Sequence, residues 1–403
     1  METSLWRSIF CAVFTSVLFR EWDIILIRKT SQTEMNRSDS GKTTKGIGRR
    51  EFLFKALISG GLAARYLGSE ARFLLSESAF GQTPQNDISS QNVKELVTPN
   101  IDFFVRNHFA IPKISEEAWR LEIHGLVSNP LKLSYSDVLL MPSVRRLSTL
   151  ECAGNVSGGG GVGTAVWSGV PLGPLLRQAG LKPGTTTIAF HGADSGEGED
   201  VPPGPHFARA IPLEKAMDPA TLLAYEMNGE PLPAKHGFPL RALVPGWYGM
   251  DSVKWLTSIE VTEQPFKGYF QDEKYVSLGA HGASRPITRM QANSKFFRPS
   301  EGEEIRVKRY RAEGVAWAGE RKIARVEVRV GGGAWQPANL AASPATMIWT
   351  SWSYEWQVPG SGRYTLEVRA TDDGGRSQPE VRDPDRKDPY ELNTPHLVNV
   401  SVP

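Results

Sequence analysis

The sequence predicts an α+β domain over residues 82–280, followed by an all-β sandwich over residues 281–403. Two observations indicate this fold class. The first region alternates short β-like runs with a few short helical segments, whereas the second contains alternating strands separated by turns rich in glycine and proline. The chain has 403 residues, which is enough for two separate hydrophobic cores.

Residues 1–81 are expected to be an N-terminal extension that carries an export signal. Arg49 and Arg50 stand directly before the mainly apolar stretch EFLFKALISGGLAARYLG, a pattern typical of a twin-arginine signal. Such a signal predicts export to the periplasm in the folded state, with cleavage before Gln82. The alternative is an N-terminal helix with a chance arginine pair. The residues before Met35 are unusual for this signal, so Met35 is a second candidate for the start of the chain.

The first folded region has four segments that favour strands and three that favour helices. The expected strands lie at residues 119–127, 185–193, 240–245 and 253–261. The expected helices lie at residues 135–141, 171–180 and 212–217. Because the strands are short and the helices few, a repeated βαβ pattern is not indicated, and an α+β domain is the better prediction.

The second region predicts a β-sandwich of immunoglobulin-like type. Its alternating segments lie at residues 304–319, 323–340, 350–375 and 397–403. Their length and their spacing by turns are typical of sandwich strands. We expect much of the core to come from four tryptophans, which are Trp317, Trp335, Trp352 and Trp356.

The composition argues against several classes of protein. The net charge is +2 and the Lys and Arg residues are spread along the chain, which gives no indication of nucleic-acid binding. The 2 cysteines are too few for a disulfide framework or a thiolate zinc or iron–sulfur site. There is no C-x-x-C-H motif, so we expect no haem in this chain. No membrane span is expected after the signal, because no stretch of about 18 apolar residues occurs there.

The segment LECAGNVSGGGGVG joins Cys152 to a run of glycines. Gly158, Gly160 and Gly163 formally satisfy the dinucleotide pattern G-x-G-x-x-G. However, the residues that follow, TAVWSGVP, favour a strand, whereas the dinucleotide motif opens a helix. A short turn is therefore the better prediction for the glycines. From composition and spacing alone, Cys152 could be an inert buried cysteine or a reactive centre.

Four segments together resemble the sulfite oxidase family of molybdenum enzymes. They are TPNIDFFVRNHFAIP, LECAGN, LLAYEMNGEPLPAKHGFPLRALVPGWYGMDSVKWL and WTSWSYEWQVP. The resemblance covers about residues 95–400, in the order of the family. It implies a molybdopterin-binding catalytic domain with the sulfite oxidase fold, followed by an immunoglobulin-like domain through which the protein forms a homodimer.

The resemblance also assigns roles to individual residues. Cys152 matches the cysteine whose thiolate binds molybdenum, a soft ligand that suits this metal. Arg106 would direct a cation towards an anionic substrate, and Tyr275 matches the active-site tyrosine. The positions that match cofactor contacts are Phe104, Val105, Arg106, Asn107, His108, Asp194, His236, Arg241, Ser252, Val253 and Lys254.

The implied function is oxidation of sulfite to sulfate by oxygen-atom transfer, with one molybdenum–molybdopterin cofactor per chain. The electrons would pass to a separate acceptor such as a c-type cytochrome. Two alternatives stay open. One is reduction of an S-oxide or N-oxide with the same cofactor, and the other is a secreted binding protein whose cofactor site is vestigial.

The sequence departs from the family near the substrate. Val156 and Ser157 stand where animal and plant members carry an arginine, and GGGGVG replaces a longer loop with a lysine and a tryptophan. A further substrate arginine near WTSW has no obvious counterpart, and neither has the haem domain of the animal enzymes. Arg106 is therefore the one clear cation left for an oxyanion, which predicts weaker sulfite affinity or a different substrate.

Overall fold

The computed structural model describes residues 96–198, 201–202, 204–279, 284–341 and 346–403. The expected export signal, the start at Met35 and the cleavage point before Gln82 lie outside the described residues. So does the expected domain boundary between residues 280 and 281. None of the helices within the described ranges is long and apolar enough to cross a membrane.

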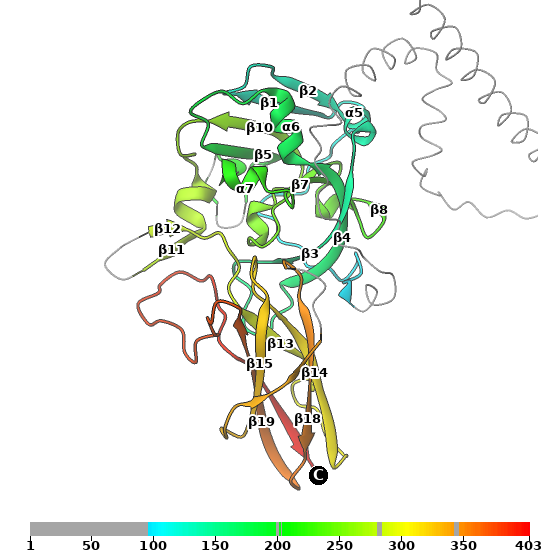
Figure 1. The fold of residues 1–403 in the computed structure, drawn as a ribbon, viewed down its shortest axis with the longest axis vertical. Helices are drawn as coiled ribbons and strands as arrows, with labels where there is room; N and C mark the ends of the chain where they lie inside the picture. The colour runs from blue at the N-terminus through cyan, green and yellow to red at the C-terminus, as the bar shows by residue number, and fades with distance from the viewer. Residues whose placement is uncertain (1–95, 199–200, 203, 280–283, 342–345) are drawn as a thin grey trace, which may run out of the picture. The chain divides into compact units, whose positions relative to one another are not determined.

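The first region contains two five-stranded sheets (Figure 1). In one, the strand order is β2-β1-β10-β5-β6, and β1 and β10 run parallel while the other neighbours are antiparallel. Leu121 and Ile123 of β1 are fully buried, as the alternation of the sequence predicts. The strands of this sheet are β1 (Arg120–Gly125), β2 (Leu131–Ser134), β5 (Thr187–Ser195), β6 (His206–Pro212) and β10 (Leu256–Thr262).

The other sheet, which has the order β3-β4-β7-β8 with β9 paired to β7, carries the segment before Cys152. Every residue of β4 is buried, so this strand shows no polar alternation in the sequence. Cys152 follows directly after β3. The strands of this sheet are β3 (Val144–Glu151), β4 (Val162–Pro171), β7 (Leu222–Met227), β8 (Glu230–Pro231) and β9 (Arg241–Leu243).

Three short helices accompany these sheets, namely α5 (Tyr135–Leu140), α6 (Leu172–Ala179) and α7 (Leu213–Met217). The start of α5 is fixed by a capping box, in which Ser134 and Asp137 satisfy each other's backbone N–H groups. The end of α6 is fixed by Gly180, whose φ of 72° allows the left-handed cap.

The second region is a two-sheet sandwich, and the sheets share one hydrophobic core. One sheet has the order β13-β14-β18-β17, and the other has the order β16-β15-β19-β20. The strands are β13 (Asn293–Arg298), β14 (Arg309–Trp317), β15 (Ile323–Val330), β16 (Gln336–Pro337), β17 (Asn339–Leu340), β18 (Thr350–Gln357), β19 (Gly362–Asp372) and β20 (His396–Val402). The small hairpin of β11 (Val276–Leu278) and β12 (Ser284–Pro286) precedes it.

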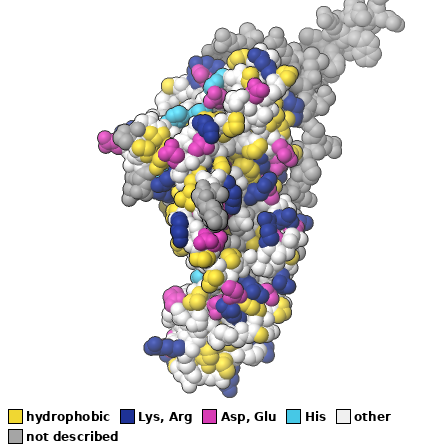
Figure 2. Space-filling model, turned by 90° about the vertical axis from the view of Figure 1, so that its left-hand side faces the viewer, with side chains coloured by type: hydrophobic (Ala, Val, Ile, Leu, Met, Phe, Trp, Pro, Cys, Tyr) yellow, Lys and Arg dark blue, Asp and Glu magenta, His cyan; other side chains and the backbone are white. Residues whose placement is uncertain are grey.

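The predicted fold class, α+β followed by a β-sandwich, is confirmed, and every expected helix and strand of the first region is present with shifted ends. The immunoglobulin-like type of the sandwich stays a prediction. Five strands of the two sheets in the first region, β2, β3, β6, β7 and β8, lie outside the segments expected to be strands. Basic and acidic side chains are interspersed over the face drawn in Figure 2.

The expectation that all four tryptophans fill the sandwich core was wrong for two of them. Trp352 and Trp356 do pack in that core. Trp317, by contrast, belongs to the hydrophobic core of the first region. Trp335 is half-buried between the guanidinium groups of Arg329 and Arg369, whose carbon atoms lie 4.4 and 4.3 Å from its ring. A tryptophan next to a strand end can face a neighbouring unit as easily as its own core, and periodicity does not distinguish the two.

Candidate functional site

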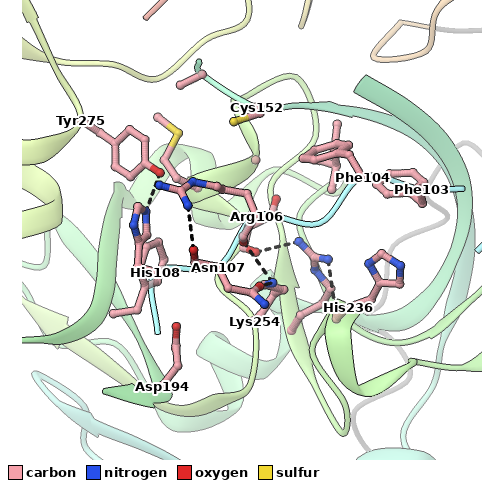
Figure 3. Close-up of a pocket in the computed structure, with 17 residues that line it drawn as sticks. Phe103, Phe104, Arg106, Asn107, His108, Cys152, Asp194, His236, Lys254 and Tyr275 are labelled. Carbon is pink, nitrogen blue, oxygen red and sulfur yellow. Dashed lines mark hydrogen bonds between the residues drawn. The ribbon is translucent and has the colours of Figure 1, made fainter. Parts of the chain in front are cut away.

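Most of the expected site residues line one pocket, which Figure 3 shows. Its empty volume, which includes open solvent at the mouth, is about 670 Å³. The lining residues come from segments far apart in the sequence. They are Phe103, Phe104, Arg106, Asn107, His108, Leu150, Cys152, Ala153, Asp194, Phe207, His236, Arg241, Gly249, Met250, Ser252, Lys254 and Tyr275.

Cys152 is held at the end of β3 by the closing pair of the β3–β4 hairpin. Its backbone N–H donates to the carbonyl of Gly161 at 2.8 Å. The side chain is a free thiol that lines the pocket. Burial raises the pKa of this thiol, whereas a hydrogen bond from the Gly154 backbone and the charge of Arg106 favour the thiolate. A positively charged partner such as a metal ion would remove the remaining cost of ionisation.

The loop that carries Phe104 to His108 is anchored to the second sheet. The Thr98 N–H donates to the carbonyl of Thr164 at 2.7 Å, and the Asn228 side chain donates to the carbonyl of Thr98 at 3.0 Å. Phe103 is buried and packs edge-on against Trp167, with ring centroids 5.9 Å apart. These contacts fix the loop on a rigid strand pair, which suits a binding segment.

Arg106 lies at the exposed side of the pocket. Its guanidinium donates to the carbonyl of Asn107 at 3.0 Å. Within the described part of the chain, no carboxylate forms an ion pair with it. It is also the one exposed Arg or Lys among the lining residues that the structure describes, because Arg241 and Lys254 are shielded from solvent. An exposed cation without a carboxylate partner, next to a thiol, favours an anionic substrate.

His108 and Tyr275 meet inside the pocket. The Nε2 atom of His108 lies 2.7 Å from the phenol oxygen of Tyr275. Tyr275 directly follows the π-helical turn Phe270–Lys274. The ring of Phe270, in this turn, packs against His108, with the ring centroids 4.9 Å apart. Burial and the charge of Cys152 raise the pKa of Tyr275, so its hydroxyl stays protonated and can act as a donor.

Arg241, which is buried, and Lys254, which is half-buried, are two further cations of the pocket. Arg241 is 4% exposed and donates to backbone carbonyls, including those of His236 at 3.1 Å and Ser252 at 2.9 Å. The Lys254 ammonium donates to the carbonyl of Arg106 at 3.2 Å and to the side chain of Asn107. Burial lowers the pKa of Arg241 to about 9 and that of Lys254 to about 7.

Two further polar side chains complete this end of the pocket. Burial lowers the pKa of His236 to about 4, and its Nε2 atom lies 3.1 Å from the carbonyl of Asn100, so the ring is a neutral donor. Burial raises the pKa of Asp194 to about 6. One carboxyl oxygen of Asp194 is buried and has no hydrogen-bond partner among the described residues.

These side chains fit the cofactor that the resemblance implies. The buried Arg241 and the half-buried Lys254, which form no ion pair with a carboxylate among the described residues, suit a phosphate group. The unsatisfied oxygen of Asp194 requires a donor such as the N–H of a heterocycle. Cys152 supplies a soft sulfur ligand for molybdenum. Unpaired polar groups shielded from water are costly without ligands, so the two cations point to a bound anion and the Asp194 oxygen points to a bound N–H or O–H donor.

The structure separates two expected contacts from the rest. Val105 is 42% exposed and Val253 is packed in the hydrophobic core, and neither lines the pocket. Each is next to a lining residue, so only its backbone could contribute. Conversely, Met250 and Phe207 line the pocket but carry no sequence signal of their own.

Tyr390 is another residue that sequence reasoning missed. It is 8% exposed and its ring centroid lies 5.2 Å from that of Tyr275. The backbone N–H of the next residue, Glu391, donates to the carbonyl of Ala153 at 2.9 Å. The segment between β19 and β20 therefore reaches the turn that follows Cys152.

The glycine run forms a turn and leads into strand β4 instead of a helix. Gly158 has a φ of 73°, and a Cβ atom there would lie 2.1 Å from the ring of His396. The Ser157 hydroxyl donates to the carbonyl of Thr394 at 2.7 Å. Glycine is needed here because the turn packs tightly on the sandwich.

Two family models match the chain in succession. The model described as "Oxidoreductase molybdopterin binding domain" matches residues 108–270. The model described as "Mo-co oxidoreductase dimerisation domain" matches residues 284–385.

The chain is also similar to individual proteins. It is 32% identical over 340 residues to mitochondrial sulfite oxidase of Homo sapiens, and the aligned region covers 76% of this chain and 61% of the relative. It is 33% identical over 335 residues to nitrate reductase [NADH] 1 of Arabidopsis thaliana, and here the aligned region covers 71% of this chain and 36% of the relative. Hence the chain spans about three-fifths or less of the length of these relatives.

Among solved structures, the chain resembles the sulfane dehydrogenase SoxCD from Paracoccus pantotrophus. The TM-score is 0.67 at 28% sequence identity, over 78% of this chain and 82% of the other.

Proposed function

Because the chain belongs to the sulfite oxidase family of molybdopterin-dependent oxidoreductases, we propose that it oxidises a small sulfur oxyanion, with sulfite as the first candidate. One observation carries this proposal: the exposed guanidinium of Arg106 lines the same pocket as the Cys152 thiol. A cation beside the metal ligand attracts an oxyanion to the place where the chemistry occurs.

The residues that would hold the cofactor divide into three groups. Arg241 and Lys254 would bind the phosphate end of the cofactor, and His236, whose N–H donates to the carbonyl of Asn100, lines the same pocket. Asp194 would accept a hydrogen bond from its heterocycle, and Cys152 would bind the metal through its thiolate. When bound, the molybdenum–molybdopterin cofactor supplies oxygen-atom transfer and two-electron redox chemistry.

The remaining polar groups of the pocket would act on the substrate. Arg106 would hold the anion by charge-assisted hydrogen bonds. The protonated hydroxyl of Tyr275 would donate a hydrogen bond to the reacting group, and His108 would hold that hydroxyl in place at 2.7 Å. The aromatic side chains of Phe104 and Phe207 would limit the access of water.

A second candidate is oxidation of sulfane sulfur. It is favoured by the likeness to the sulfane dehydrogenase SoxCD and by the single exposed cation among the described lining residues. A substrate with less charge than sulfite requires fewer fixed cations.

The oligomeric state, the location and the electron acceptor of the enzyme are also proposals. The match to a dimerisation domain over residues 284–385 supports a homodimer. The arginine pair at positions 49 and 50 supports export through the twin-arginine route to the periplasm. The chain would carry no haem and would pass its electrons to a separate acceptor such as a c-type cytochrome.

The test is a set of assays on purified protein from a host that makes the cofactor. We expect about one molybdenum per chain and sulfite-dependent reduction of cytochrome c or a dye. Activity with a sulfane substrate alone would favour the second candidate. Reduction of sulfoxides or N-oxides by reduced viologen, without sulfite oxidation, would show that the enzyme works in the opposite direction. Protein without molybdenum would favour a binding protein with a vestigial site.

A further inference from the structure

Glu151, the residue before Cys152, is a carboxylate enclosed by three N–H donors. It ends β3 and is 2% exposed. One oxygen, Oε2, accepts from the indole N–H of Trp317 at 2.8 Å. The other, Oε1, accepts from the side-chain amides of Asn293 at 2.9 Å and Asn155 at 3.0 Å. All three partners donate, so a group that can only accept is needed at this position.

Two of these donors belong to the sandwich. Asn293 begins β13 and Trp317 ends β14, and the two residues are directly opposite each other in the antiparallel pair. At this end of the β13–β14 pair, the side-chain N–H groups of Asn293 and Trp317 therefore lie next to each other and both donate to Glu151. This pairing places Glu151 at a contact between the sandwich and the first region.

Both donors are themselves held in place. Trp317 is 1% exposed and packs within the hydrophobic core of the first region. Asn293 is 2% exposed, and its side-chain oxygen accepts from the backbone of Ser294 at 2.9 Å and from Gln378 at 3.3 Å. Since neither side chain can rotate freely, the carboxylate between them has one position.

The third donor closes the turn that contains Cys152. The Asn155 backbone N–H donates to the carbonyl of Cys152 at 2.9 Å, and its side-chain oxygen accepts from the N–H of Gly161 at 2.9 Å. The N–H of Cys152 donates to the carbonyl of the same Gly161. Both backbone groups of Cys152 are thus bound within a turn that Glu151 connects to the sandwich.

A carboxylate at the same contact offers a comparison. Glu320, in the turn after β14, accepts from the indole N–H of Trp247 at 3.1 Å, from Lys215 at 2.7 Å and from Arg289 at 2.8 Å. It also joins the two regions, because Trp247 and Lys215 belong to the first region and Arg289 to the second. Glu320 does not line the pocket of Cys152. Glu320 therefore serves as a control, since it links the two regions without contributing to the pocket of Cys152.

We infer that Glu151 is a positioning residue for Cys152, through which the sandwich holds the metal ligand in place. The peptide bond joins the two residues directly, so a displaced carboxylate would move the sulfur, and displacements well below 1 Å matter at a metal ligand. The inference rests on the proposed function, because it concerns the thiolate as a molybdenum ligand. The sandwich, which matches a dimerisation domain over residues 284–385, would then also support the redox centre through Asn293 and Trp317.

The test compares Glu151→Gln with Glu320→Gln in the molybdenum-loaded, full-length protein. Glutamine offers one oxygen and one NH₂ group, so at least one of the three donors around residue 151 faces another donor. We expect Glu151→Gln to retain molybdenum but to shift the thiolate-to-molybdenum charge-transfer band in the absorption spectrum. The kcat should fall about 10-fold or more with little change in KM. Glu320→Gln should unfold at a similarly lowered temperature and keep the wild-type band and kcat.

A wild-type band and kcat in Glu151→Gln, with the same loss of stability as Glu320→Gln, would overturn the inference. If Glu151→Gln does not fold, Trp317→Phe decides, because it keeps an aromatic ring at this buried position, although a smaller one, and removes one donor. A shifted band in that variant supports the inference and an unchanged band refutes it. Wild-type protein without molybdenum or without the band refutes the proposed function instead.

Discussion

The Nε2 atom of His108 lies 2.7 Å from the phenol oxygen of Tyr275, although 167 positions separate the two residues in the chain. The pair joins the anchored loop before β1 to the segment after the π-helical turn Phe270–Lys274. It places a protonated hydroxyl in the same pocket as the thiol of Cys152.

Tyr275→Phe removes this hydroxyl and keeps the ring. We expect kcat to fall roughly 10- to 100-fold, because a lost hydrogen bond to a charged reacting group costs about 1.5–3 kcal/mol. Steady-state assays with sulfite measure the effect. Tyr310→Phe is the matched control, since its hydroxyl binds Glu303 at 2.7 Å in the sandwich. Equal activity of the two variants would argue against a role for Tyr275 in the reaction.

Arg106→Gln removes the exposed cation of the pocket. We expect KM for sulfite to rise about 10-fold, which corresponds to one lost charge-assisted interaction of about 1.4 kcal/mol. Added salt should raise the wild-type KM and have less effect on the variant, because the attraction to an exposed charge is screened. Arg311→Gln, at an exposed arginine paired with Glu313 at 2.7 Å, is the control. A wild-type KM in Arg106→Gln would exclude this residue from substrate binding.

Cys152→Ser replaces the soft sulfur ligand by a hydroxyl of similar size. We expect activity to be lost while the fold is retained, because serine is a poor ligand for this metal at neutral pH. Thermal unfolding, metal analysis and sulfite assays together measure the effect. Full activity with molybdenum bound normally would contradict the mechanism.

Lys254→Gln tests whether Lys254 and Arg241 bind the phosphate. Its ammonium contacts Asn107 and the carbonyl of Arg106, and burial lowers its pKa to about 7. A bound phosphate would restore the charge, so loss of this residue should lower the molybdenum content of the purified protein several-fold. The activity per molybdenum should change less. An unaltered metal content, compared with the exposed control Lys132→Gln, would place the phosphate elsewhere.

His396 predicts a dependence of stability on pH. Its Nδ1 atom accepts the backbone N–H of Phe296 at 3.0 Å, and burial, followed by the charge of Lys295, lowers its pKa to about 4. The unfolded chain binds a proton near pH 6.5 and the folded chain does not, so stability is lost as the pH falls from about 6.5 towards 4. Because the ring is partly exposed, we expect only about 1 kcal/mol between pH 7 and 5.

The measurement is the free energy of unfolding from denaturant titrations at both pH values. His396→Gln keeps an acceptor but cannot titrate, so the difference between wild type and variant isolates this group. If both proteins lose the same stability, His396 is not responsible for the pH dependence.

Much of the fold could be predicted because it depends on local patterns. The capping box at Ser134 and the glycine at position 180 mark the ends of α5 and α6 in the sequence itself. Strand β4 is buried along its whole length, so it lacks the alternation that reveals a half-buried strand. At the start of β3, Arg145 is exposed and Arg146 is half-buried, and the strand is fully buried only from Leu147 to Glu151.

Most of the candidate site could be named from the sequence because the matched segments retain the chemistry-bearing residues in order. The structure brings Cys152, Arg106 and Tyr275 to one pocket, as expected, and leaves the side chains of Val105 and Val253 outside it. Tyr390 could not be foreseen, because nothing in its segment indicates that it folds back onto Tyr275.

The sequence by itself determined the order of elements, the α+β and sandwich regions, and the kinds of donor that a molybdenum cofactor requires. The order of elements and the fold class follow from composition and local spacing, whereas the donors follow from the resemblance of four segments to a known family. Only the tertiary structure decided which partner each side chain meets. Trp317 was expected to fill the sandwich core, yet its indole N–H binds Glu151 next to the thiol. A long-range contact of this kind depends on how two regions pack, and hydrophobic periodicity carries no information about the partner across the contact.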